Sequence, residues 1–216
     1  MSKAPEKTAL TIDGPAGALE ALLESPAVVD GNRVAVLCHP HPQHHGTMMN
    51  KVVHTLSRSM NDLGVPAIRF NFRGVGASEG EFADGYGEAE DALAVIAWAA
   101  ERYPSASLTL LGFSFGGMVA ARAALSANPE QLITIAPAAS RMSGLLEESQ
   151  PKCPWLIVQG DADDVVACEE VVDWVNELAP GPEMVVVPET GHFFHGRLTQ
   201  LREIVVNYLS QQWDQT

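Results

Sequence analysis

The stretch Leu108-Thr109-Leu110-Leu111-Gly112-Phe113-Ser114-Phe115-Gly116-Gly117 decides the fold of this chain. Its first residues form an apolar run that is typical of a strand buried on both faces. Its end forms the pattern Gly-x-Ser-x-Gly, and the small residues from Met118 to Leu125 then predict a helix. In the order strand, sharp turn and helix, this pattern holds a serine at the tip of the turn with its hydroxyl exposed. We therefore expect Ser114 to be a nucleophile in a strained conformation, with glycines on both sides because the turn would crowd a Cβ.

The composition indicates one globular domain. The chain has 216 residues, of which 46% are hydrophobic, and no linker rich in Pro, Gly or Ser divides it. This is enough for one full-sized core, so we expect a single domain over residues 1–216.

The net charge of −14 disfavours several kinds of partner. Nucleic acid is disfavoured because its phosphates need Lys and Arg, and anionic substrates and anionic membranes are mildly disfavoured for the same reason. The polar N-terminus has no secretory pattern, so we expect a cytoplasmic protein without a membrane span. Cys38, Cys153 and Cys168 are odd in number and far apart, which favours free thiols.

Hydrophobic periodicity predicts an edge hairpin followed by alternating strands and helices. Strands are expected over 8–12, 18–24, 34–38, 67–72, 132–135, 155–158 and 184–187. A further strand is expected to begin at 108 and to end at the turn that holds Ser114. Helices are expected over about 50–63, 87–102, 118–125, 168–178 and 199–212. This alternation predicts an α/β protein with a mostly parallel sheet of about seven or eight strands and helices on both faces. Sites in such sheets form at the carboxyl ends of the strands.

Candidate partners of the serine follow two later strands. A serine hydroxyl needs an adjacent base, and the base needs a group that orients it. One strand ends in Gln159-Gly160-Asp161-Ala162-Asp163-Asp164-Val165-Val166, and another is followed by Glu189-Thr190-Gly191-His192-Phe193-Phe194-His195. Both segments follow strands, so they lie on the same rim as the serine. The residues alone leave three aspartates and two histidines open.

At this point the chain resembles the α/β-hydrolase superfamily, in particular small lidless bacterial serine esterases related in pattern to dienelactone hydrolases. The matching motifs cover about residues 34–200 and are His39-Pro40-His41-Pro42, Arg73-Gly74-x-Gly76-x-Ser78, Gly112-x-Ser114-x-Gly116, Gly160-x-x-Asp163-x-x-Val166 and Gly191-His192-Phe193-Phe194-His195-Gly196. The resemblance implies the α/β-hydrolase fold with no sizeable lid. Only 81–85 and 136–151 leave room for one.

The resemblance also implies a catalytic triad. Ser114 would be the nucleophile, His192 the base and Asp163 the acid that orients the base. Asp161 and Asp164 are the competitors for the acid, and one of them would instead cap the following helix or satisfy the turn. For the second histidine of the loop, at position 195, a structural role beside the two phenylalanines is the better interpretation.

An ester hydrolase needs backbone N–H groups that bind the oxyanion. One is expected from Phe115, the residue after the nucleophile. The other is expected from the loop that follows the strand over 34–38. The prolines of this loop have no N–H, which leaves His39, His41 and Gln43, and the family pattern points to His41.

Two further motifs are weaker. The histidines of the loop 39–45 resemble metal ligands, but no carboxylate or cysteine cluster with ligand spacing accompanies them. Gly74-x-Gly76 lacks the third glycine of a dinucleotide site, because Glu79 stands there. We therefore expect no metal and no cofactor, and we expect Arg73 to make structural hydrogen bonds.

Together these features predict a serine hydrolase that cleaves a carboxylic ester or similar small acyl compound. A thioesterase, a peptidase or an acyltransferase could use the same triad, and a non-catalytic binding module could use the same scaffold. The open site of a lidless enzyme favours short or soluble acyl groups. The sequence leaves the physiological substrate and the oligomeric state open.

Overall fold

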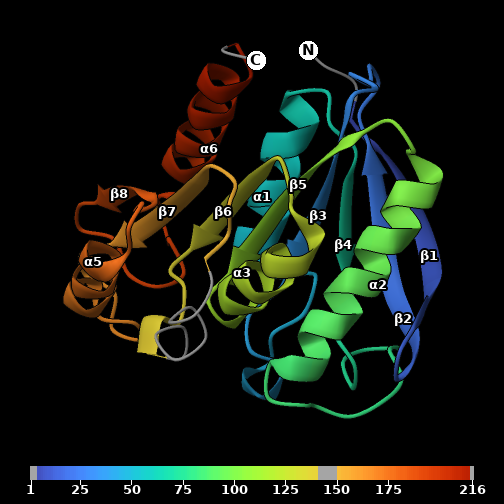
Figure 1. Ribbon diagram of the computed structural model, residues 1–216, viewed down its shortest axis with the longest axis horizontal. Coiled ribbons are helices and arrows are strands. Elements are labelled where there is room, and N and C mark those ends of the chain that lie inside the picture. Colours follow the sequence, from blue (N-terminus) through green and yellow to red (C-terminus); the bar gives the residue numbers. More distant parts are fainter. Residues whose placement is uncertain (1–3, 141–149, 215–216) are drawn as a thin grey trace.

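A computed structural model describes residues 4–140 and 150–214, and within them the strands form one eight-stranded sheet (Figure 1). The strands are β1 (Glu6–Gly14), β2 (Gly17–Ser25), β3 (Arg33–Cys38), β4 (Ala67–Phe70), β5 (Ser107–Phe113), β6 (Gln131–Ile135), β7 (Trp155–Gly160) and β8 (Glu183–Val187). The helices are α1 (Lys51–Asp62), α2 (Tyr86–Arg102), α3 (Phe115–Ala127), α5 (Cys168–Glu177) and α6 (Leu198–Trp213), with a 3-10 turn η1 (Pro42–His44).

The sheet has the order β1-β2-β4-β3-β5-β6-β7-β8. β1 and β2 form the predicted antiparallel hairpin at one edge, and β2 pairs antiparallel with β4. All other neighbours are parallel. The prediction of a mostly parallel sheet of seven or eight strands is therefore confirmed, and the carboxyl ends of β3 to β8 share one edge.

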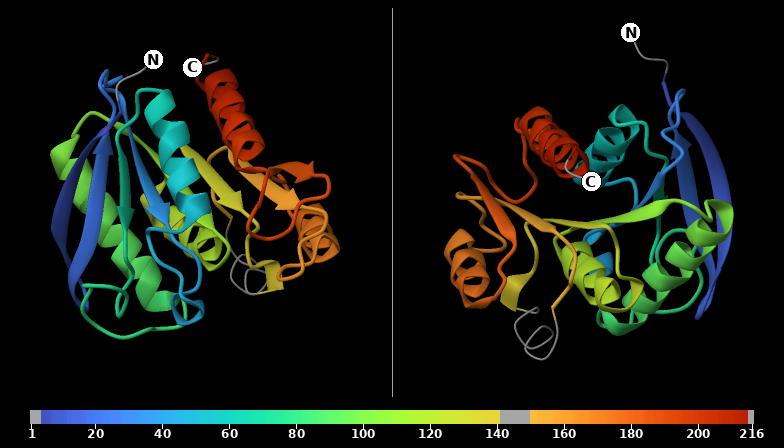
Figure 2. Two further views of the ribbon diagram at one scale, coloured as in Figure 1. Left: turned by 180° about the vertical axis from the view of Figure 1, so that it is seen from behind. Right: turned by 45° about the horizontal axis from the view of Figure 1, so that its top comes forward.

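Helices cover both faces of the sheet, as the apolar strands require (Figure 2). α1 buries Val52, Val53, Leu56 and Met60 in a cluster that it shares with α6. α2, α3 and α5 enclose a second cluster on the opposite face, where the rings of Trp155 and Trp174 lie 5.7 Å apart.

The observed elements follow the predicted ranges closely, with two differences near the predicted serine site. The strand expected over 67–72 ends at Phe70. Beyond it, the backbone N–H of Phe72 donates to His39 Nε2 rather than to the backbone of a neighbouring strand. The helix expected from Met118 already begins at Phe115. Of the two segments with room for a lid, 81–85 is a short connection before α2, whereas residues 141–149 lie outside the described residues.

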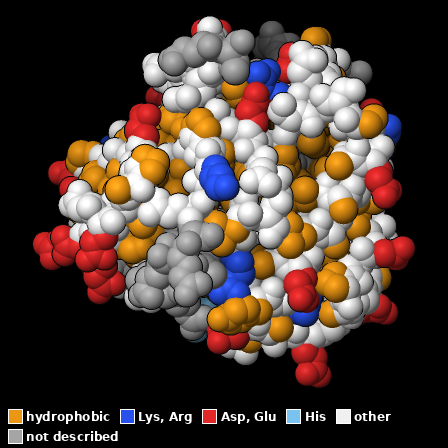
Figure 3. Space-filling view, viewed as in Figure 1, with side chains coloured by type: hydrophobic (Ala, Val, Ile, Leu, Met, Phe, Trp, Pro, Cys, Tyr) orange, Lys and Arg blue, Asp and Glu red, His pale blue; other side chains and the backbone are white. Residues whose placement is uncertain are grey.

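The surface is acidic, as the net charge requires. Figure 3 shows acidic side chains gathered at the end of the molecule where α5 lies, and Glu169, Glu170, Asp173 and Glu177 on this helix are exposed. All three cysteines are free thiols, as expected. In the described ranges, no helix is both long and apolar enough to cross a membrane.

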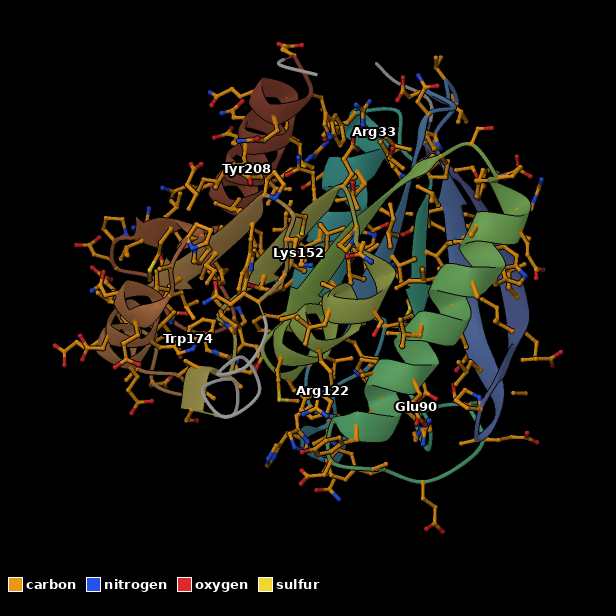
Figure 4. All side chains as sticks on the ribbon, in the orientation of Figure 1. Arg33, Glu90, Arg122, Lys152, Trp174 and Tyr208 are labelled. Carbon is orange, nitrogen blue, oxygen red and sulfur yellow. The ribbon has the colours of Figure 1, made fainter. Side chains whose placement is uncertain are left out.

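Arg73 forms a buried ion pair that joins the end of β4 to α2. Its Nη2 lies 2.8 Å from Asp91 Oδ1, and its own backbone N–H is donated to Asp91 Oδ2 at 2.9 Å. The side chain of Asp91 is fully buried, whereas that of Glu90, the second partner of Arg73, is 65% exposed on the same helix (Figure 4). The structural role predicted for Arg73 is confirmed.

We expect Asp91→Asn to lower the free energy of unfolding by about 3 kcal/mol, because it leaves a buried guanidinium without its counter-charge. Glu90→Gln removes the same charge from an exposed partner and should change the free energy by about 0.5 kcal/mol or less. Urea unfolding of both variants measures the difference. Equal losses would contradict the assignment of the stabilising contact to Asp91.

Candidate active site

Ser114 is the single residue between β5 and α3. Its backbone has φ 56° and ψ −120°, a strained conformation that residues other than glycine rarely adopt. Its N–H is donated to Ile135 at the end of β6, which fixes the turn against the sheet. A Cβ at Gly112 would collide with the Gly116 carbonyl, and one at Gly116 would collide with the carbonyls of Cys38 and His39. The glycines are needed because backbone passes against backbone here.

His192 approaches the serine from the loop after β8. Its Nε2 lies 3.0 Å from Ser114 Oγ, and the imidazole is nearly buried. The loop is held against the end of β7 by a hydrogen bond from Ala162 N–H to the Thr190 carbonyl. A Cβ at Gly160 would collide with the same carbonyl. The small residue at the end of β7 thus lets the two loops meet.

Asp163 lies on the other side of the imidazole, with Oδ2 2.8 Å from His192 Nδ1. Its Oδ1 accepts the backbone N–H groups of Val165 and Val166, and Gln159 Nε2 donates to Oδ2 at 3.0 Å. Burial alone would raise the pKa of Asp163, but the hydrogen bonds from His192, Val166 and Val165 outweigh it, so the pKa lies below its usual value.

These contacts determine how the imidazole can act. An ionised Asp163 has only acceptor oxygens, so His192 Nδ1 must carry the proton that it donates to Oδ2. Nε2 of the neutral ring is then the acceptor for the Ser114 hydroxyl. This is the arrangement that a general base needs.

The other candidates of these loops stand apart from this hydrogen-bonded set. Asp161 and Asp164 are exposed, and neither caps α5, whose N-cap is Ala167 without a side-chain hydrogen bond. His195 is exposed and lies beside the ring of Phe193 at 5.9 Å. The structure therefore brings Ser114, His192 and Asp163 together and leaves these three residues outside.

The two expected oxyanion donors are neighbours. The ring of His41 lies 4.7 Å from that of Phe115, because the loop after β3 passes against the start of α3. Phe115 is the first residue of α3, where backbone N–H groups have no partner within the helix. That both N–H groups bind an oxyanion stays a prediction.

His39 has a structural role that the sequence did not reveal. It is fully buried, accepts the N–H of Phe72 at Nε2, and therefore donates from Nδ1 to the Pro40 carbonyl at 2.6 Å. Burial lowers its pKa to about 4, against the opposing effect of this last bond, so the ring is neutral near pH 7. Within the described residues, no three His, Cys, Asp or Glu side chains are grouped to hold a metal ion.

Gln159 is a second residue that sequence analysis missed. Its amide donates to Asp163 and to the Val166 carbonyl, so it positions the carboxylate within its turn. The available signal was a polar residue near the end of an otherwise apolar strand.

Comparison with known proteins identifies the family. Residues 18–150 match the family described as X-Pro dipeptidyl-peptidase (S15 family). The chain belongs to the S15 family of α/β serine hydrolases. A lidless serine hydrolase from Xanthomonas campestris is 42% identical, with a TM-score of 0.91 over 95% of this chain and 94% of its own. A serine hydrolase homologue from Coxiella burnetii is 43% identical, with a TM-score of 0.89 over 94% and 97%.

The predicted resemblance to dienelactone hydrolases is confirmed at the level of the fold. A dienelactone hydrolase from Anabaena variabilis superposes with a TM-score of 0.81 over 97% of this chain and 99% of its own. Only 15% of the residues are identical, so this likeness concerns the fold alone.

The contact between the two loops can be tested with glycine variants. We expect Gly160→Ala to lower the free energy of unfolding by about 2 kcal/mol, since the new Cβ must push away the Thr190 carbonyl. Gly191→Ala is the control, because a Cβ there meets only the Ala162 oxygen, at 3.5 Å. Thermal unfolding gives both values. A stable Gly160→Ala protein would show that the loops are not in close contact.

Proposed function

We propose that this serine hydrolase cleaves a small carboxylic ester through an acyl-enzyme formed on Ser114. The observation that carries the proposal is the unbroken line of hydrogen bonds from Ser114 Oγ to His192 and from His192 to the buried Asp163. The strained turn presents the hydroxyl at the carboxyl edge of the sheet, where ligands of such folds bind.

In the first half of the reaction, Ser114 Oγ attacks the ester carbonyl carbon while His192 Nε2 accepts the hydroxyl proton. The ring is then a cation, and the carboxylate of Asp163 stabilises it through Nδ1–H. Nε2–H protonates the alcohol oxygen as its bond to the carbonyl carbon breaks. The alcohol leaves, and the acyl group remains on Oγ.

In the second half, water takes the place of the alcohol. His192 Nε2 removes a proton from the water as its oxygen attacks the acyl carbon, and then returns that proton to Ser114 Oγ. The carboxylic acid leaves and the free enzyme is restored. In both halves, the N–H groups of Phe115 and His41 are the proposed donors to the oxyanion, at the N-terminus of α3 where the helix dipole favours negative charge.

A peptidase is the second candidate, since the matched family is described as X-Pro dipeptidyl-peptidase. The proposed triad would serve an amide as well as an ester. An amide leaves as an amine, which must be protonated, and His192 would supply this proton in the same way. The two functions therefore differ in substrate recognition, and an experiment must separate them.

The triad assignment predicts how the protein reacts with a fluorophosphonate, which labels activated serines. Intact mass should show one adduct on the wild-type protein, and peptide mapping should place it on Ser114. Asp163→Asn should slow labelling by about 10³- to 10⁴-fold, because Nδ1 loses its carboxylate acceptor. Asp164→Asn is the matched control and should label at the wild-type rate. An adduct on Ser114→Ala, or equal rates in both Asn variants, would argue against the triad.

The ester assignment predicts the ranking in a substrate panel. We expect kcat/KM to be highest for 4-nitrophenyl acetate or butyrate, and about tenfold or more lower for the palmitate, since an open site buries little of a long chain. An acyl thioester and an X-Pro 4-nitroanilide complete the panel. A higher kcat/KM for the anilide than for the acetate would make the peptidase the better assignment.

A further inference from the structure

A basic cavity outside the proposed triad plays no part in the mechanism above. It has a volume of about 330 Å³ and lies between β1, β4, α1 and the start of α6. Four basic side chains line it: Lys7, Lys51, His54 and Arg69. None of its described lining residues is acidic, although the chain has a net charge of −14.

Arg69 lines this cavity and is completely buried. Its Nε donates to Glu24 Oε2 at 2.8 Å, and its Nη1 donates to the Met48 carbonyl. Its Nη2 has no acceptor among the described residues. A buried guanidinium N–H without an acceptor is unfavourable, and such a group indicates a missing partner.

Glu24 does not neutralise the cavity. Its Oε2 already accepts from Arg69 and from the Ser57 hydroxyl, and its Oε1 pairs with Lys7 at 2.9 Å. Lys51 forms no ion pair with any residue of the described ranges. Glu24 therefore pairs with Lys7 and Arg69 but not with Lys51, so the cavity keeps an excess of positive charge.

The pKa of His54 reflects the same excess of positive charge. Burial lowers this pKa, and the cations of Arg69, Lys7 and Arg58 lower it further, against the opposing effect of Glu24. The surroundings of the imidazole thus disfavour another positive charge, as expected of a site that lacks an anion.

Met49 lines the cavity next to the guanidinium. Its Sδ lies 3.8 Å from Arg69 Nη1, although the residue as a whole is 63% exposed. Because methionine is flexible and this one is not packed in the core, its side chain can turn away and open a path to Arg69.

We propose that this cavity binds an oxyanion, a phosphate or carboxylate group, between the guanidinium of Arg69 and the ammonium groups of Lys51 and Lys7. Guanidinium and ammonium groups are the usual donors to such anions. The inference does not depend on the proposed hydrolytic function.

The anion has two possible sources. Lys51 also lines a second cavity, of about 270 Å³, together with Phe193 and His195. The ring of Phe193 lies 5.1 Å from that of His192, so this second cavity adjoins the proposed triad. The anion is therefore either a charged group of the ester substrate or a free ion that binds independently.

Inorganic phosphate is the probe for binding. In thermal unfolding at constant ionic strength, replacing chloride by phosphate should raise the Tm of the wild-type protein in a saturable way. Lys51→Gln should weaken phosphate binding by about tenfold or more. Arg58→Gln is the matched control: it removes one positive charge from an exposed site on the same helix, outside the cavity lining, so it should weaken phosphate binding far less than Lys51→Gln does.

The absence of a phosphate-dependent Tm shift, or equal shifts in the wild type and Lys51→Gln, would overturn the proposal. Neither result depends on hydrolysis, so failure here is distinct from failure of the ester assignment.

Kinetics then separate the two possible sources of the anion. If the site holds part of the substrate, phosphate raises the KM for 4-nitrophenyl hemisuccinate but not for the acetate. If the site holds a free ion, saturating phosphate leaves both KM values unchanged while the Tm shift persists. Both results support the site.

Discussion

The close approach of the turn at Ser114 to the end of β3 constrains everything around the site. At Gly116 the backbone of α3 passes so near the carbonyls of Cys38 and His39 that a Cβ has no room. The contact positions the serine and the loop after β3 together, and the strain at φ 56° is supported by the buried strands on either side. The loops after β7 and β8 then have only to reach this fixed point.

Two buried charges show how the acidic chain uses its few cations. Arg73 holds α2 to the end of β4 through Asp91, and Arg69 holds β4 to β2 through Glu24. The hydrogen bonds around Glu24 keep its pKa near 2 despite burial, so this carboxylate stays ionised near pH 7. No buried nitrogen of Arg73 is left without a hydrogen-bond partner, whereas Nη2 of Arg69 has no acceptor among the described residues.

The fold was largely predictable because each buried strand is an apolar run and α1 has a clear apolar face. Ser114 was predictable from its motif, whereas the choice of His192 over His195 came from the family resemblance. The choice of Asp163 over Asp161 and Asp164 was not determined by the residues alone, because it depends on which carboxylate turns inward to accept the N–H groups of the next two valines. Arg69 was hidden within a predicted apolar strand, because its partner Glu24 lies 45 residues away in the sequence.

The separation of the proposed triad along the chain has a consequence for folding kinetics. Ser114 and His192 are 78 residues apart, and Asp163 lies 29 residues before the histidine. Closing such loops is entropically expensive and comes late, after local helices and neighbouring strands have formed. A nascent or partly folded chain thus lacks the proposed triad, which is complete only when β7 and β8 have joined the sheet.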